Sequence, residues 1–371
     1  MERASVTYHD YEVEIFGSKR RERLKISGDY PKSQLAESVF SQLGLMHLVA
    51  PYLPEQIRTN FWVSDPMRRL IGAMYRSEKR GMPCFIFNID ADNDTGNSQP
   101  GLRTHSRTHS GRAVVAYSAG KDSMWNMWWA QEKYGRDNVM AIHIGGLNRS
   151  NGSKEREYAA RQARELGFKN FRTIDLLNSS QNTGYQIMRS RDMFLVGVII
   201  PIALEFGASK IITEGFSETG PDEPFTGQEK STIYFNKILR EMGIPVRVVW
   251  RNRNEMDVLK DLFTNHPDWL PHVCNCFSVP CYQPNLRRSW KRRAPTFKLY
   301  DSQCGSCVKC RITNLGRIFY DPKTRNVSVE DICVYLRNTA EWIRVNGERL
   351  KDVIGGSFMR DFRGASKKYG L

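Results

Sequence analysis

The pattern of hydrophobic and polar positions divides the chain into segments of different character. Residues 1–91 combine short alternating runs, such as residues 11–15, with a helical period over residues 35–48, and they end in the apolar run Cys84–Phe87. Alternation predicts strands with one buried face, and apolar residues spaced three and four apart predict an amphipathic helix. We therefore expect an N-terminal α+β domain over residues 1–91.

A polar stretch follows, and after it the pattern changes. Residues 92–111 are rich in Gly, Ser and Asn without a hydrophobic period, which predicts a linker. Strand-like runs then alternate with helical patterns. Strands are expected over residues 113–117, 139–144, 171–176, 210–213 and 246–250, and helices over residues 124–134, 154–166 and 193–206. This alternation predicts an α/β domain with a parallel sheet over residues 112–273. Ligands of such sheets bind at the carboxyl ends of strands, after Tyr117, Ile144 and Thr213.

Residues 118–123, with the sequence SAGKDS, connect the first of these strands to a helix. At that junction the free backbone N–H groups and the helix dipole both favour a phosphate. Gly120 lets the backbone approach a ligand closely, and the hydroxyls of Ser118 and Ser123 can donate hydrogen bonds. A Walker A loop is excluded, because that motif requires a glycine in place of Val115. The segment is thus expected to bind ATP phosphates without γ-phosphate kinase activity.

The charged residues of this loop supply candidate catalytic groups. Lys121 can neutralise charge on a departing pyrophosphate, Asp122 can hold Mg²⁺, and Ser123 completes the proposed catalytic set. The hexapeptide resembles the SGGxDS signature of the PP-loop ATP pyrophosphatases, which cleave ATP between the α- and β-phosphates. Ala119 stands where that family has glycine, so a positive φ at this position would strain the loop. Of the neighbouring strand ends, Tyr117 and His143 complete the expected ATP-binding set.

Cysteines concentrate in the C-terminal part of the chain, where six of the eight lie within residues 274–310. Four thiolates with no open position form a structural tetrahedral zinc site. We expect the ligands to be Cys281, Cys304, Cys307 and Cys310. Cys274 and Cys276 stay open as alternatives to Cys281, and an iron–sulfur cluster is the alternative to zinc. Residues 274–371 are thus expected to be a zinc-binding and C-terminal helical module.

The PP-loop signature and the CGxCxxCR module together resemble the 7-cyano-7-deazaguanine synthase (QueC) family. Cys281-Tyr282, followed by the three later cysteines and Arg311, is similar to the zinc pattern of that family. The resemblance runs over residues 113–317. It implies a Rossmann-like PP-loop fold with an added N-terminal domain, as in a diverged member linked to anti-phage defence. It also implies substrate-binding roles for Arg191, Glu214 and Asp222.

The activity that this resemblance implies is an AMP- and pyrophosphate-forming ligase that uses ATP, Mg²⁺ and Zn²⁺. The carboxylate of 7-carboxy-7-deazaguanine would attack the α-phosphate to give an acyl-adenylate. Ammonia would then give an amide and, after a second activation, a nitrile. An amine of a protein partner could take the place of ammonia, and residues 1–91 would then hold that acceptor.

Net charge and hydropathy bear on two alternative functions and on the cellular location of the protein. The formal charge of +15 attracts nucleotides, nucleic acid or acidic protein surfaces, and it suits a tRNA-modifying PP-loop enzyme that adenylates a base. A zinc-stapled nucleotide sensor without catalysis is the third interpretation. No apolar run reaches the length of a membrane span, and the first residues lack a secretory signal, so a cytoplasmic protein is expected. An oligomer is left open.

Three tryptophans follow the loop at helical spacing, namely Trp125, Trp128 and Trp129. Because the helix that carries them must bury a face against the sheet, we expect them to pack in the core, with stacking of a nucleobase as the alternative. Cys84 and Cys333 lie apart from the cysteine cluster and are expected to be small buried residues.

Overall fold

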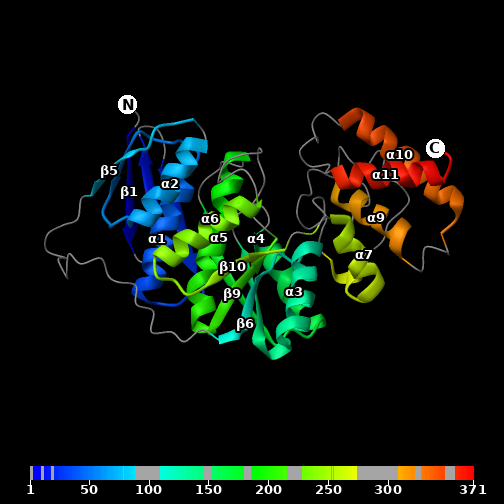
Figure 1. Cartoon of the computed structure of the whole chain (residues 1–371), viewed down its shortest axis with the longest axis horizontal. Helices are drawn as coiled ribbons and strands as arrows, with labels where there is room; N and C mark the ends of the chain where they lie inside the picture. The colour runs from blue at the N-terminus through cyan, green and yellow to red at the C-terminus, as the bar shows by residue number, and fades with distance from the viewer. Residues whose placement is uncertain are drawn as a thin grey trace. The chain divides into compact units, whose positions relative to one another are not determined.

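The computed structural model in Figure 1 describes most of the chain. The described residues are 3–9, 12–17, 21–77, 79–87, 109–145, 152–178, 185–214, 228–251, 253, 255–273, 308–321, 327–346 and 356–371. They belong to two compact units. The first comprises Met1–Tyr117, Asn126–Gly152 and Phe168–Arg251, and the second comprises Ser118–Trp125, Ser153–Gly167 and Asn252–Leu371.

A sheet of ten described strands organises the first unit. The strands are β1 (Arg3–His9), β2 (Glu12–Gly17), β3 (Arg21–Ser27), β4 (Gln56–Thr59), β5 (Cys84–Phe87), β6 (His109–Ala116), β7 (Val139–Gly145), β8 (Asn170–Asn178), β9 (Ala208–Thr213) and β10 (Arg247–Trp250). Their order is β10-β9-β6-β7-β8-β3-β2-β1-β4-β5. The strands β6 to β10 pair in parallel, which confirms the expected α/β class.

The strand order reverses at β6. The next strands in the chain, β7 and β8, continue on one side of β6, whereas β9 and β10 lie on the other side. Doubly wound sheets bind their ligands at such a reversal, outside the carboxyl ends of the strands. The loop that follows β6 in the chain therefore occupies the position where this fold class places a ligand.

The described part of the chain contains ten α-helices. They are α1 (Gln34–Val49), α2 (Asp65–Ser77), α3 (Lys121–Tyr134), α4 (Gly152–Glu165), α5 (Tyr185–Glu205), α6 (Gln228–Glu241), α7 (Glu255–Asn265), α9 (Val308–Tyr320), α10 (Val329–Asn346) and α11 (Gly356–Lys368). Four of them, α1, α3, α4 and α5, stand where the hydrophobic period predicts helices. None of the helices in the described part of the chain is long and apolar enough to cross a membrane.

The N-terminal strands, which lie in the segment expected to form an α+β domain over residues 1–91, share the sheet of the α/β segment. Strand β3 pairs antiparallel with β8, so that Leu24 lies opposite Asn178 and Ser27 opposite Asp175. One hydrophobic core contains residues of both segments, and strand β6 begins at His109, inside the expected linker. The pairing satisfies backbone groups of β3 and β8 that would otherwise be exposed at two sheet edges.

Helix α5 explains why the two segments share a core. Its residues from Met193 to Leu204 are buried almost without interruption, and a helix that is apolar all round requires neighbours on every side. Helix α1 supplies one of them, with the rings of Phe40 and Phe194 5.9 Å apart. Gly197 permits this close approach, because a Cβ atom there would lie 1.9 Å from Cδ1 of Leu43.

The described helices of the C-terminal segment pack within the second unit. A Cβ atom on Gly316 of α9 would lie 2.8 Å from Cδ1 of Leu259, so α7 and α9 approach closely there. Of the two isolated cysteines, Cys84 is exposed and Cys333 is half-buried. The expectation that both are buried is wrong, since Cys84 lies on β5, the last described strand of the sheet.

Candidate functional site

The loop after β6 contains a residue in a left-handed conformation. Strand β6 ends at Ala116, the N–H of Tyr117 still donates to the carbonyl of Ile142 at 2.8 Å, and α3 begins at Lys121. Between them, Ala119 has φ +63° and is 1% exposed. An L-residue other than glycine pays on the order of 1 kcal/mol for this conformation. The positive φ considered for this position on sequence grounds is therefore present, with alanine in place of glycine.

The two serine hydroxyls hold the loop together. The Oγ atoms of Ser118 and Ser123 lie 3.1 Å apart, and Ser123 Oγ donates to the carbonyl of Gly120 at 3.0 Å. Because the Ser123 hydroxyl proton is already donated to Gly120, Ser118 is the donor in the bond between the two hydroxyls. Ser123 is fully buried, whereas Ser118 is exposed. In this structure Ser123 shapes the loop from within, and Ser118 is the serine that is exposed to solvent.

Lys121 and Asp122 form an ion pair at the start of α3. The Nζ atom of Lys121 lies 2.7 Å from Oδ1 and 2.6 Å from Oδ2 of Asp122. The lysine side chain is fully buried, while the aspartate side chain is 30% exposed. A buried ammonium ion is costly unless a counter-charge accompanies it, and Asp122 supplies that charge. Each carboxylate oxygen keeps lone pairs that can accept a metal ion from the solvent side.

A glutamine that the sequence analysis missed supports the loop from α4. The Nε2 atom of Gln162 donates to the carbonyl of Ala119 at 3.3 Å, and it also donates to the carbonyl of His272. Gln162 is 2% exposed. Its signal in the sequence is its position between Ala159 and Ala163, on the buried face of a helix where an unpaired amide would be unfavourable.

His143 lies at the end of β7 and contacts the residue before the loop. It is buried, and its Nδ1 atom lies 2.9 Å from the carbonyl oxygen of Tyr117. Because a carbonyl only accepts, Nδ1 carries the proton in this contact. The ring of Tyr117 packs edge-on against Phe168 at 5.3 Å and Phe171 at 6.5 Å. His143 thus holds the backbone at the end of β6, and its predicted place beside the adenine stays a prediction.

The structure describes only some of the residues predicted to bind the substrate or zinc. Glu214 follows β9 directly and is exposed, and Arg191 lies in α5 with a side chain outside the described set. Six predicted positions lie outside the described residues, namely Asp222, Cys274, Cys276, Cys281, Cys304 and Cys307. Among the residues that are described, no three His, Cys, Asp or Glu side chains gather closely enough to bind a metal ion.

Cys310 is the one predicted zinc ligand within the described residues, and it lies in a buried polar environment. It is 1% exposed in the first turn of α9. The next residue, Arg311, is also buried and donates to Oγ1 of Thr339 at 2.8 Å, while its carbonyl accepts from the hydroxyl of Tyr335 at 2.7 Å. Burial raises the pKa of the Tyr335 hydroxyl well above its usual range, although Arg311 partly opposes this.

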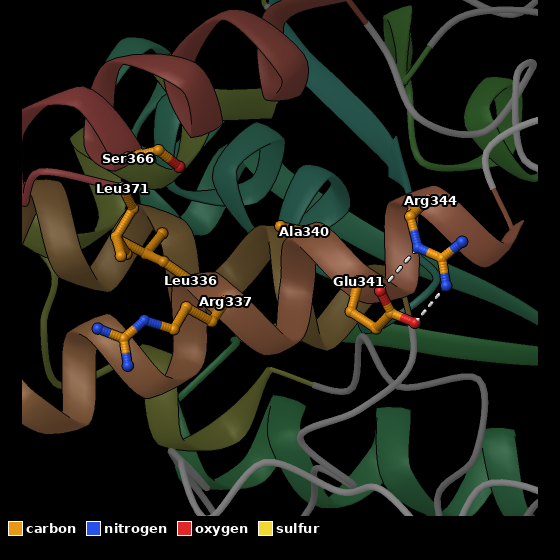
Figure 2. A pocket seen from close by; sticks show the side chains of 7 residues that line it. All are labelled: Leu336, Arg337, Ala340, Glu341, Arg344, Ser366 and Leu371. Carbon is orange, nitrogen blue, oxygen red and sulfur yellow. Dashed lines mark hydrogen bonds and ion pairs between the residues drawn. The ribbon is translucent and has the colours of Figure 1, made fainter.

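A shallow depression of about 470 Å³ opens between α10 and α11 in the second unit (Figure 2). It is lined by Leu336, Arg337, Ala340, Glu341, Arg344, Ser366 and Leu371. Figure 2 shows the Glu341 carboxylate joined to the Arg344 guanidinium, with an N–O distance of 2.7 Å. None of the lining residues belongs to the loop, so this depression is not the candidate phosphate site.

Comparison with known proteins does not identify a family for the chain. No protein-family profile matches the chain, and no curated protein matches it. Among solved structures, the chain is similar to a glutamine-dependent NAD⁺ synthetase from Acinetobacter baumannii, determined in complex with adenosine diphosphate. The match covers 70% of this chain at 11% identity with a TM-score of 0.22. It spans 45% of that protein's length. Because this TM-score is too low to establish a common fold, the candidate site rests on the loop itself.

Proposed function

We propose that the chain is an ATP-dependent ligase of the PP-loop type that forms AMP and pyrophosphate. The backbone of the loop carries this proposal. Ala119 adopts a left-handed φ at the glycine position of the SGGxDS signature, directly after the strand at which the sheet order reverses. Helix α3 begins at Lys121, and its first helical hydrogen bond is donated by Met124 to the carbonyl of Gly120 at 2.9 Å. The N–H groups that precede Met124 lie at a helix N-terminus, where an anion is stabilised.

In the proposed reaction a substrate carboxylate oxygen attacks the α-phosphorus of ATP, and the bond to the β-phosphate oxygen breaks. The products are an acyl-adenylate and pyrophosphate. An amine then attacks the acyl carbon, AMP leaves with the electron pair of the C–O bond, and the amine loses a proton. The loop N–H groups would stabilise charge on the phosphates, and the Ser118 hydroxyl would join them by turning away from Ser123.

Asp122 is the residue that would hold Mg²⁺, which supplies charge neutralisation on the phosphate oxygens. Its carboxylate fits that role, since it is partly exposed and each oxygen retains a free lone pair beside Lys121. Lys121 is too deeply buried to contact a ligand in the present arrangement. It acts on the reaction either by fixing the Asp122 carboxylate or by moving toward the departing pyrophosphate.

The substrate and the acceptor follow from the resemblance to the 7-cyano-7-deazaguanine synthase family. The substrate would be 7-carboxy-7-deazaguanine or a related carboxylate, bound by Arg191, Glu214 and Asp222. The acceptor would be ammonia or an amine of a protein partner. The position of Glu214, exposed immediately after β9, is compatible with a ligand-binding role at the carboxyl end of a parallel strand.

Zinc belongs to the same proposal. Cys310 fits a thiolate ligand because it lies in the first turn of α9, next in sequence to the buried Arg311. Cys281, Cys304 and Cys307 would complete a tetrahedral site, whose chemistry is structural: it would join the start of α9 to the preceding segment.

Two other functions are each supported by one observation. The net charge of +15 supports a tRNA-modifying PP-loop enzyme that adenylates a base. The complete burial of Lys121 and Ser123 supports a nucleotide sensor without catalysis, because both groups already have partners within the loop.

Pyrophosphate–ATP exchange tests the proposal. The protein is incubated with ATP, Mg²⁺, labelled pyrophosphate and 7-carboxy-7-deazaguanine. A reversible adenylation step transfers label into ATP only when the carboxylate is present. Asp122→Ala should abolish the exchange, whereas Asp268→Ala, which removes an exposed carboxylate of the same unit, should leave it unchanged. If exchange never occurs with any carboxylate or with tRNA, the sensor is the remaining function.

A further inference from the structure

Cations and aromatic rings alternate along one side of α3 in the first unit. The Cζ atom of Arg251 lies 3.9 Å from the ring centre of Trp129, and Lys133 Nζ lies 4.9 Å from the same ring. Lys133 Nζ is also 5.6 Å from the ring centre of Tyr134, which Lys210 Nζ approaches to 5.0 Å. These five residues form a continuous row, which we call the cation–aromatic strip.

A further cation extends the strip across the sheet. Lys210 of β9 is the parallel partner of Arg247 in β10, so both side chains leave the sheet on the same face. The contact of Lys210 with Tyr134 identifies this face as the one beside α3. Arg247 is exposed, and β10 is the last strand at this end of the described sheet. Within the described residues, the strip therefore adjoins the edge strand of the sheet.

The rings of the strip are partly exposed. Trp125 is 2% exposed, as expected for a core residue, but Trp129 and Tyr134 are only half-buried. The expectation that all three tryptophans pack in the core is thus wrong for Trp128 and Trp129, which are both half-buried. Glu132 is the one carboxylate in the last turns of α3, and Asp137 beyond the helix already pairs with Lys169 at 2.8 Å. Positive charge dominates this part of the surface.

We propose that the cation–aromatic strip binds a single-stranded nucleic acid segment. Such strands alternate anionic phosphates with flat bases, and proteins bind them by combining cations along the backbone with platforms for stacking. The strip presents the same alternation, and a guanidinium plane such as that of Arg251 is itself a surface on which bases stack. An acidic protein would use the cations but would leave the rings without a matching partner. The inference stands apart from the ATP chemistry proposed above.

Fluorescence anisotropy with a labelled single-stranded RNA of mixed sequence tests the charge component. Lys133→Gln/Lys210→Gln should weaken binding on the order of tenfold at about 0.1 M salt and reduce the log–log salt slope by about 1.4, because each lost phosphate contact contributes about 0.7. The matched control, Lys367→Gln/Lys368→Gln, removes the same charge from exposed positions of the second unit and should bind as the wild type does. Equal losses in both variants would overturn the proposal, as would the absence of binding.

The aromatic component needs its own variants. Tyr134→Leu removes the ring, whereas Tyr134→Phe retains it. Leucine should weaken RNA binding several-fold without changing the salt slope, and phenylalanine should be close to the wild type. Thermal melting checks that both variants fold. If poly-glutamate displaces the RNA at equal charge concentration and both Tyr134 variants bind alike, the strip is a site for acidic proteins and the proposal fails.

Discussion

The side-chain amide of Gln162 donates a hydrogen bond to the carbonyl oxygen of Ala119, the residue whose left-handed backbone shapes the loop after β6. The two residues are 43 positions apart in the chain. The bond therefore ties the conformation of the loop to α4, and it links a structural contact to the proposed binding of ATP.

Replacing Gln162 by leucine should weaken ATP binding. The change leaves the carbonyls of Ala119 and His272 without their donor, which costs about 1–3 kcal/mol, so the dissociation constant for Mg-ATP should rise by up to about 5- to 150-fold. Isothermal titration measures this. Gln131→Leu is the matched control, because Gln131 is also buried but its Nε2 atom makes no hydrogen bond within the described structure. Equal affinities in the two variants would contradict a positioning role for Gln162.

Substitutions at Ala119 should separate ATP binding from stability. Ala119→Gly relieves the left-handed strain but adds freedom to the unfolded chain, so the unfolding free energy should change by less than about 1 kcal/mol while ATP binding persists. Ala119→Val should destabilise the loop and abolish binding, because a β-branched residue is disfavoured at positive φ. Ala116→Val adds the same two methyl groups to strand β6 and is the control. Retention of ATP binding by Ala119→Val would argue against the loop as the site.

The contact between α1 and α5 predicts that alanine substitutions at two glycines change the unfolding free energy in opposite directions. Gly197→Ala forces Leu43 to move and should cost about 1–3 kcal/mol of unfolding free energy. Gly364→Ala lies in α11 with open space around the new methyl group, and it should stabilise by about 0.5–1 kcal/mol. Urea denaturation measures both. A neutral Gly197→Ala would show that α1 does not pack on α5 as described, and with it the shared core would be in doubt.

The buried hydroxyl of Tyr335 predicts a pH dependence of stability. Its pKa is raised in the folded state, mainly by burial, so the folded state keeps the proton that the unfolded state loses above about pH 10. The stability contribution is complete below that pH and falls as the pH rises further. Tyr335→Phe should cost about 1 kcal/mol at pH 7, through the lost bond to Arg311, and should show a weaker alkaline decline. Denaturation at pH 7 and above pH 10 checks this, with Tyr369→Phe as control.

Local patterns in the sequence predicted the elements around the loop well. The runs that became β6, β7, β9 and β10 are apolar because strands of a parallel sheet are covered on both faces. The strand–loop–helix order around SAGKDS also follows from periodicity. The positive φ at Ala119 could be considered in advance because the family signature has glycine there.

Contacts between residues far apart in the chain could not be predicted from local sequence patterns. The pairing of Leu24 with Asn178 joins strands that are far apart in the chain, and nothing in either strand alone specifies the other. The burial of Lys121 against its neighbour Asp122 depends on the packing of α3 and could not be read from two charged residues in a motif. The same holds for Gln162, whose role depends on where α4 places it.

The most direct test of the central claim is the identity of the nucleotide product. ATP labelled at the α-phosphate is incubated with the protein, Mg²⁺ and 7-carboxy-7-deazaguanine, beside the Asp122→Ala variant. We predict labelled AMP from the wild-type protein in the presence of the carboxylate, and none from the variant. Formation of labelled ADP instead would contradict the proposed cleavage between the α- and β-phosphates.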